Sequence, residues 1–139
     1  MRKLVHLLFL LAGSSYAQQW SQLPSLPGAA RDDGSSFSIG SDIYVGTGMD
    51  EGFQLTTDSA SFVLDGLGYV CGGLLQGGSA TGQVWAYDPA TNAWVARAPL
   101  PGVPRHRAMA FSANGKGYVV GGADAQYQAL NDGWCYDPF

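Results

Sequence analysis

The chain has 139 residues, so it forms one domain at most, and charged residues are scarce at 13%. Seven basic and eleven acidic residues give a net charge of −4, which excludes the basic footprint of a nucleic-acid-binding protein. Twenty glycines suit short strands and tight turns, and no helical periodicity is evident after the first dozen residues. The composition therefore favours an all-β fold.

Residues 1–17 are predicted to form a secretory signal peptide. Two basic residues are followed by an apolar stretch over residues 4–12 and by a small-residue cleavage pattern that ends at Ala17. The apolar stretch is shorter than the ~20 residues that span a bilayer, and Gln18 rather than a cysteine follows the cut. Cleavage removes two of the seven basic residues and no acidic one, which leaves a net charge of −6. We expect a secreted or periplasmic protein with no membrane attachment.

Three later segments, residues 37–48, 62–73 and 111–122, share one pattern. Each begins with a Phe, has a Tyr seven residues later and closes on glycines. A two-residue turn signal, such as Asp65-Gly66, lies between the Phe and the Tyr. Each segment is therefore predicted to be a β-hairpin that ends where only a bare backbone is tolerated.

A second pattern fixes the period of these segments. Trp-x-Tyr-Asp-Pro occurs at residues 85–89 and again at 134–138, an offset of 49 that also separates Phe62 from Phe111. With Trp94 and the Pro-Gly-x-x-Arg sequence that ends at Arg105, the pattern resembles the kelch repeat, one blade of a β-propeller. The resemblance covers residues 20–139 and extends to exported bacterial kelch proteins. It implies a ring of four-stranded blades.

The repeat is interrupted once. Phe62 follows Phe37 at an offset of only 25, which is 24 short of the offset of 49, so half a repeat is missing between Asp58 and Ser59. The match of Trp20 to Trp94 at an offset of 74 keeps the frame on both sides of this gap. We interpret the gap as the loss of the outer half of a blade and the linker after it. A divergent short blade is the alternative.

We therefore predict a partial kelch-type β-propeller whose ring is not closed. Residues 18–58 comprise an N-terminal strand and a half blade, residues 59–104 a complete blade, and residues 105–139 an incomplete blade without a fourth strand. The segment Met49 to Asp58 is expected to be a loop with no strand. Open edges and an uncovered blade favour self-association, and the chain is interpreted as a fragment, a damaged gene product or an assembly subunit. The predicted strands are near residues 20–23, 35–39, 42–46, 60–64, 68–71, 84–87, 93–97, 108–112, 117–120 and 133–136.

Loops that follow the glycines gather on one face of a propeller, where binding usually occurs. The candidate ligand-binding residues there combine aromatic, amide and carboxylate groups, which suits a protein or carbohydrate ligand. Arg31 and Arg105 share a repeat position and are either blade-to-blade hydrogen-bond donors or carboxylate-binding residues. Tyr69, Tyr87, Trp85, Trp94 and their repeat mates are predicted to pack in the core. The loop candidates are Asp50, Glu51, Phe53, Gln76, Asp124 and Tyr127.

An enzyme is the less favoured class. Residues 43–48 look like the opening of sialic acid mutarotases, and an Arg that grips the carboxylate of the sugar acid suits such a reaction. Only His106 remains after signal cleavage, which disfavours a metal site and copper–radical chemistry, so we expect no cofactor and assign no catalytic residue. Cys71 and Cys135 are predicted to be small core or sheet residues rather than a disulfide. The function favoured by the sequence is a protein- or glycan-binding module; a mutarotase relative or a non-functional remnant is the alternative.

Overall fold

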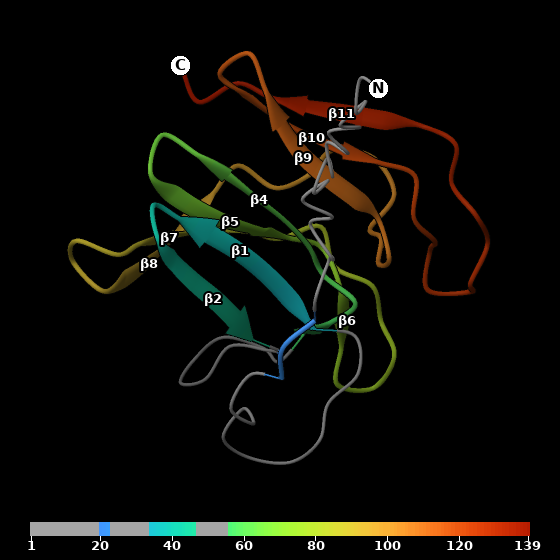
Figure 1. Cartoon of the computed structure of the whole chain (residues 1–139). Coiled ribbons are helices and arrows are strands. Elements are labelled where there is room, and N and C mark those ends of the chain that lie inside the picture. The colour runs from blue at the N-terminus through green and yellow to red at the C-terminus, as the bar shows by residue number, and fades with distance from the viewer. Residues whose placement is uncertain (1–19, 23–33, 47–55) are drawn as a thin grey trace, which may run out of the picture.

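The computed structural model describes residues 20–22, 34–46 and 56–139, and this part of the chain contains strands and no helix (Figure 1). Nothing in these ranges is a helix long and apolar enough to cross a membrane. The strands, in chain order, are β1 Ser35–Ile39, β2 Asp42–Gly46, β3 Thr56–Thr57, β4 Ala60–Leu64, β5 Leu67–Cys71, β6 Leu74–Leu75, β7 Val84–Asp88, β8 Ala93–Arg97, β9 Met109–Ala113, β10 Lys116–Val120 and β11 Gly133–Tyr136.

The strands form separate antiparallel sheets. Strands β4, β5, β7 and β8 pair in this order as a four-stranded sheet, the complete blade. Strands β1 and β2 form the half blade, strands β9, β10 and β11 form the incomplete blade, and β3 pairs with β6. Figure 1 shows the complete blade between the other two. The predicted fold, a partial kelch-type β-propeller whose ring is not closed, is confirmed.

The two-residue turns predicted from the sequence close the three hairpins. Both turn residues have positive φ in the complete and incomplete blades, at 51° and 77° for Asp65-Gly66 and at 51° and 72° for Asn114-Gly115. In the half blade, Gly40 has a φ of 61°. These dihedral angles give the turn a twist that matches the twist of the paired strands, so the hairpins form where the turn residues permit them.

The register of each hairpin places its Phe directly opposite its Tyr. Stacked aromatic pairs of this kind stabilise a sheet by roughly 0.5–1.5 kcal/mol beyond the area that they bury. Each pair therefore marks the same position in its blade. The stacked rings, with their centroid distances, are Phe37 and Tyr44 at 5.3 Å, Phe62 and Tyr69 at 4.9 Å, and Phe111 and Tyr118 at 5.2 Å.

Neighbouring blades contact each other through a Phe on one and a Gly on the next. The ring of Phe62 lies so close to Gly117 that a Cβ at residue 117 would be 2.2 Å from the ring Cε2. Phe37 and Gly68 repeat the contact one blade earlier, at 2.1 Å. Glycine permits this approach because it has no side chain. In the half blade, the position that Gly68 and Gly117 occupy in the other two blades is taken by Ile43, which is 71% exposed.

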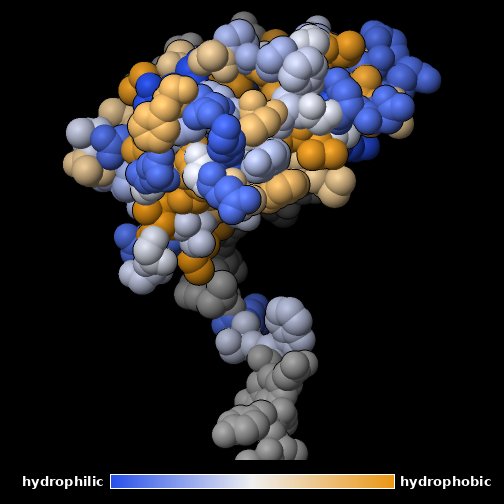
Figure 2. Space-filling model, turned by 90° about the horizontal axis from the view of Figure 1, so that it is seen from above, coloured by the Kyte–Doolittle hydropathy of each residue, from blue (hydrophilic) through white to orange (hydrophobic). Residues whose placement is uncertain are grey.

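The buried core lies between the complete blade and the incomplete blade. Repeat mates of Ala60 and Phe62 in the incomplete blade, Met109 and Phe111, are 67% and 50% exposed, because no further blade covers them in the described part of the chain. Apolar side chains are accordingly exposed among polar ones on the face seen in Figure 2. The core residues are Ala60, Phe62, Leu64, Tyr69, Cys71, Val84, Ala86 and Val119. Cys71 is buried, Cys135 is exposed, and both thiols are free.

Two predicted features are wrong. Of the strand predicted over residues 20–23, the described residues Trp20 to Gln22 are in no strand and Trp20 is fully exposed, whereas Leu23 lies outside the described residues. The segment Met49 to Asp58 was expected to lack a strand, but Thr56–Thr57 forms β3 and pairs with β6. The β-branched threonines suit an extended backbone, and β6 supplies the edge that they need.

Candidate functional site

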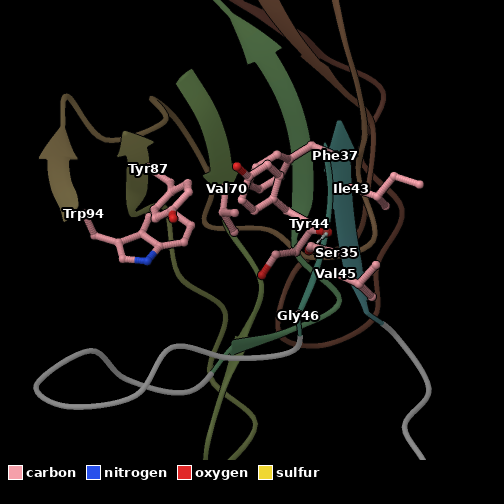
Figure 3. A pocket seen from close by; sticks show the side chains of 10 residues that line it. Ser35, Phe37, Ile43, Tyr44, Val45, Gly46, Val70, Tyr87 and Trp94 are labelled. Atoms are coloured by element: carbon pink, nitrogen blue, oxygen red, sulfur yellow. Dashed lines mark hydrogen bonds between the residues drawn. The ribbon is translucent and has the colours of Figure 1, made fainter. Parts of the chain in front are cut away.

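A groove of about 380 Å³ separates the half blade from the outer strands of the complete blade (Figure 3). Phe37 and Tyr44 project into it from the half blade, and Tyr87 and Trp94 face them from β7 and β8. We call it the aromatic groove. Its lining comprises Ser35, Phe37, Ile43, Tyr44, Val45, Gly46, Ser59, Val70, Tyr87 and Trp94.

The aromatic groove lies where the half blade has no outer strands. In the complete blade, β7 pairs with β5 and β8 pairs with β7. Among the described residues, β2 pairs with β1 alone. Phe62 follows Phe37 at an offset of 25 where the next offset is 49, so the counterpart of β7 and β8 has no sequence from which to form. The space that this counterpart would occupy is the groove.

Aromatic rings line this groove, and few hydrogen-bonding groups accompany them. The ring centroids of Tyr44 and Tyr87 are 5.4 Å apart, and those of Tyr87 and Trp94 are 5.1 Å apart. The Tyr87 hydroxyl donates to Oδ1 of Asn92 at 2.9 Å. Loss of hydration, followed by the nearby Asp42 carboxylate and Tyr87, raises the pKa of Tyr44 above its ordinary value of 10.0. The groove is therefore suited to a neutral, largely apolar chain segment.

A second candidate is a polar cluster where the complete and incomplete blades meet. The side chains of Asp58 and His106 are 5% and 0% exposed, and Oδ2 of Asp58 lies 2.9 Å from Nε of Arg107. The same Oδ2 lies 3.3 Å from Nδ1 of His106, which is ion-pair distance without the direction of a hydrogen bond. Asp58 and Arg107 are repeat mates at an offset of 49, with φ angles of 59° and 56°. This ion pair joins equivalent positions of neighbouring blades.

The loop after β10 encloses the other side of His106. Nε2 of His106 lies 3.1 Å from the backbone oxygen of Asp124, and the Tyr127 ring meets the imidazole edge-on with centroids 5.0 Å apart. The guanidinium carbon of Arg107 is 5.5 Å from the centroid of the Tyr127 ring. The Asp124 carboxylate accepts two backbone N–H groups of its own loop. Both nitrogens of the buried imidazole thus face protein groups, which suits a structural role better than acid–base chemistry.

Arg105 lies inside the protein rather than at the mouth of a pocket. It is 1% exposed, and its guanidinium donates to both oxygens of Asp132, at 2.5 and 2.8 Å. It also donates to the backbone oxygens of Gly121 at 3.0 Å and Val103 at 3.3 Å. The hydrogen bond from Arg105 holds the pKa of Asp132 below its ordinary value of 3.8. The arrangement ties the linker before β9 to the loop before β11.

The structure brings two of the predicted ligand-binding residues together and leaves others apart. Asp124 and Tyr127 both contact His106, whereas Gln76 is exposed in the turn after β6. No group of three or more His, Cys, Asp or Glu side chains in the described ranges is placed to hold a metal ion. Four further candidates, Arg31, Asp50, Glu51 and Phe53, lie outside the described residues.

Sequence reasoning assigned the aromatic residues of the groove to the core. Tyr87, Trp94 and Tyr44, the repeat mate of Tyr69, instead line an open groove, whereas Tyr69 is only 3% exposed. The signal that predicts the difference is the missing half repeat between Asp58 and Ser59, because its loss removes the strands that would cover these rings.

One comparison with known proteins identifies a motif in the complete blade. Residues 56–101 match the family model of the kelch motif, and no curated protein matches the chain. The matched residues begin at β3, include the whole of the complete blade and end in the linker after β8. The match shows a kelch motif in this part of the chain, and it coincides with the four-stranded sheet that the structure has there.

Proposed function

We propose that this chain is an exported protein-binding module that holds an extended segment of a partner protein in the aromatic groove. The observation that carries the proposal is the groove itself, about 380 Å³ in volume and lined by Phe37, Tyr44, Tyr87 and Trp94. Concave, mostly apolar sites with aromatic walls are typical of ligand-binding pockets. The kelch motif supports the broader statement, a propeller-type module for protein interaction.

The polar groups of the groove favour a protein segment over a carbohydrate. Carbohydrates require many hydrogen bonds, but the Ser35 hydroxyl already donates to the Ser59 backbone oxygen at 2.9 Å. The Ser59 hydroxyl donates to the backbone oxygen of Gly72 at 3.2 Å, and the Tyr87 hydroxyl is held by Asn92. Three hydroxyls that line the groove are therefore already hydrogen-bonded within the protein, and most of the remaining lining side chains are aromatic or aliphatic. Glycan binding is the less supported half of the sequence hypothesis.

No observation favours a sialic acid mutarotase. The guanidinium of Arg105 is buried and already binds the carboxylate of Asp132, and Arg31 lies outside the described residues. The remaining alternative, a non-functional remnant, predicts a product that aggregates or lacks a cooperative thermal transition. Circular dichroism with a melting scan and light scattering after size-exclusion chromatography test this alternative directly.

Export is the second part of the proposal, and it is supported by the signal-peptide pattern of residues 1–17. The test is to express the full-length chain in a bacterial host and to measure the mass of the product recovered outside the cytoplasm. A mature protein that begins at Gln18 is expected. A product that stays in the cytoplasm with residues 1–17 attached contradicts export.

The binding test is a selection from a peptide display library on the immobilised chain, with a glycan array in parallel. We expect peptides that bind the wild type and lose binding to Tyr44→Ala. Tyr118→Ala is the matched control, because Tyr118 is the corresponding residue of the incomplete blade and is absent from the groove. Selection of glycans alone, or of peptides insensitive to Tyr44→Ala, contradicts the proposed function.

A further inference from the structure

The complete blade shows what occupies the place beside the second strand of a finished blade. There, β7 pairs with β5, so that Ala86 lies opposite Tyr69 and Val84 lies opposite Cys71. Val84 and Ala86 are only 4% and 2% exposed and belong to the core. Trp85, which lies between them, is on the other face of the strand, because side chains alternate along a strand. The small residues of β7 thus face the following blade.

The half blade has the same positions at an offset of 25. Tyr44 is the repeat mate of Tyr69, and Gly46 is the repeat mate of Cys71. A strand added beside β2 in the same register therefore places a small residue opposite Tyr44 and a Val opposite Gly46. No described atom lies within 4 Å of the position that a Cβ of Gly46 would take, so the groove has space for that Val.

The outer edge of β2 has the backbone groups that such a strand needs. In an antiparallel ladder, alternate residues direct their N–H and C=O groups to the partner strand. The two-residue turn pairs Ile39 with Asp42, so Ile43 and Val45 direct their backbone groups away from β1. Among the described residues, no strand pairs with this edge of β2. An exposed, apolar strand edge is a template for another strand.

We infer that the aromatic groove is a strand-acceptor site, in which β2 pairs with an antiparallel strand donated by a different polypeptide. The inference rests on the proposed function and adds the backbone pairing, the register and the sequence pattern. The donor has small aliphatic residues at alternate positions, facing Tyr87 and Trp94 across the groove, and aromatic residues between them. Addition of a strand to a sheet edge is an established mode of peptide recognition, in which the backbone gives affinity and alternate side chains give specificity.

The donor is a different polypeptide because this chain has no free strand of the required pattern in its described part. Valine, tryptophan, alanine and tyrosine follow one another in β7, but β7 lies between β5 and β8. Strand β11 has the related sequence Gly-Trp-Cys-Tyr and pairs with β10. Neither strand of a second copy is available unless its own blade opens.

The probe is a fluorescein-labelled peptide with the sequence of residues 82–90, which contains β7, and binding to the full chain is measured by fluorescence anisotropy. In the expected register, the N–H at the position of Tyr87 faces β2, whereas the N–H at the position of Ala86 faces away. We expect N-methylation of the peptide at the Tyr87 position to weaken binding by about tenfold, the effect of losing one backbone hydrogen bond. N-methylation at the Ala86 position is expected to leave the affinity within about twofold.

Two variants of the protein test the acceptor edge. Val45→Pro removes an outward N–H from β2 and is expected to abolish binding of the peptide. Ala96→Pro, on the exposed edge strand β8, is the matched control and is expected to keep binding. Circular dichroism establishes that each variant is folded. If Val45→Pro does not fold, the N-methylated peptides still decide the question, because they use the unaltered protein.

The outcomes separate the inference from the function on which it rests. Binding that is lost in Tyr44→Ala but is indifferent to N-methylation means that the groove binds a segment without strand pairing, which overturns the inference alone. Absence of binding by the peptide also overturns the inference, and the display selection then decides the proposed function independently. A dimer that Val45→Pro dissociates, together with no peptide binding, means that a second copy occupies the edge and likewise overturns it.

Discussion

Substitution of Gly117 by alanine tests the contact that joins the complete blade to the incomplete blade. A Cβ at this position would be 2.2, 2.3 and 2.9 Å from three atoms of the Phe62 ring, whereas ordinary contact begins at 3.4 Å. The ring must therefore withdraw by more than an ångström. Phe62 is 4% exposed and also stacks on Tyr69, so it has little space for this movement.

The expected loss of stability follows from two opposing effects. Overpacking of a core costs about 1–3 kcal/mol, and the reduced backbone freedom of alanine in the unfolded chain returns about 0.5–1 kcal/mol. We expect Gly117→Ala to lower the free energy of unfolding by about 1–2 kcal/mol, the upper part of the net range, because the ring is enclosed. Gly68→Ala is expected to cost less than about 1 kcal/mol, because its partner Phe37 borders the aromatic groove and has space to move.

The assay is urea unfolding followed by tryptophan fluorescence, with both variants compared with the wild type. A double-mutant cycle that combines Gly117→Ala with Phe62→Leu isolates the contact, and the double variant is expected to lose less stability than the sum of the single variants. If Gly117→Ala is neutral, or if Gly68→Ala costs more than Gly117→Ala, the reasoning from the Phe–Gly contact is refuted.

Four further predictions concern the Arg105–Asp132 ion pair and the thiols. Arg105→Ala is expected to cost about 2–3 kcal/mol in urea unfolding, since it removes charge-assisted hydrogen bonds from a buried site; a loss below about 0.5 kcal/mol would contradict it. Because the pKa of Asp132 is lowered in the folded state, its contribution to stability is present above pH 3.8 and is lost as the pH falls through the lowered value. The difference in the free energy of unfolding between the wild type and Asp132→Asn should therefore shrink at acidic pH. Burial raises the pKa of Cys71 from 9.0 to about 12, so stability should decline by up to about 1.4 kcal/mol per pH unit above pH 9, and Cys71→Val should remove this decline. At pH 8, a thiol reagent should modify Cys135 in the native protein and both cysteines only after unfolding; rapid native modification of Cys71 would show that its burial is wrong.

The hairpins and the blade order could be predicted from the sequence because both are encoded locally. Each turn dipeptide specifies positive φ angles, and the offset of 49 aligns the hairpins of the complete and incomplete blades. The bounds of β1, β2, β4, β8 and β11 are those predicted. The short pairing of β3 with β6 was missed because two residues give no periodicity from which a strand can be recognised.

The candidate site was harder to predict because it depends on which neighbour is absent. Tyr44 and Tyr69 occupy the same repeat position, yet one lines a groove and the other is buried beneath β7 and the next blade. The sequence pattern alone assigns both to a core. The ion pair of Asp58 with Arg107 was missed for a different reason, since a positive φ at an arginine has no sequence signal.

The isoleucine that replaces the repeated glycine in the half blade limits how identical copies can assemble. A head-to-tail contact would place Phe111 of one copy on Ile43 of another, as Phe37 is placed on Gly68. At Gly117, where the Phe62 ring is enclosed, a Cβ would be 2.2 Å from the ring, so the larger, branched side chain of Ile43 obstructs the same seating. Contacts that repeat without closing generate open fibres. Among the described residues, the half blade therefore carries a steric obstacle to head-to-tail stacking of identical copies into a filament.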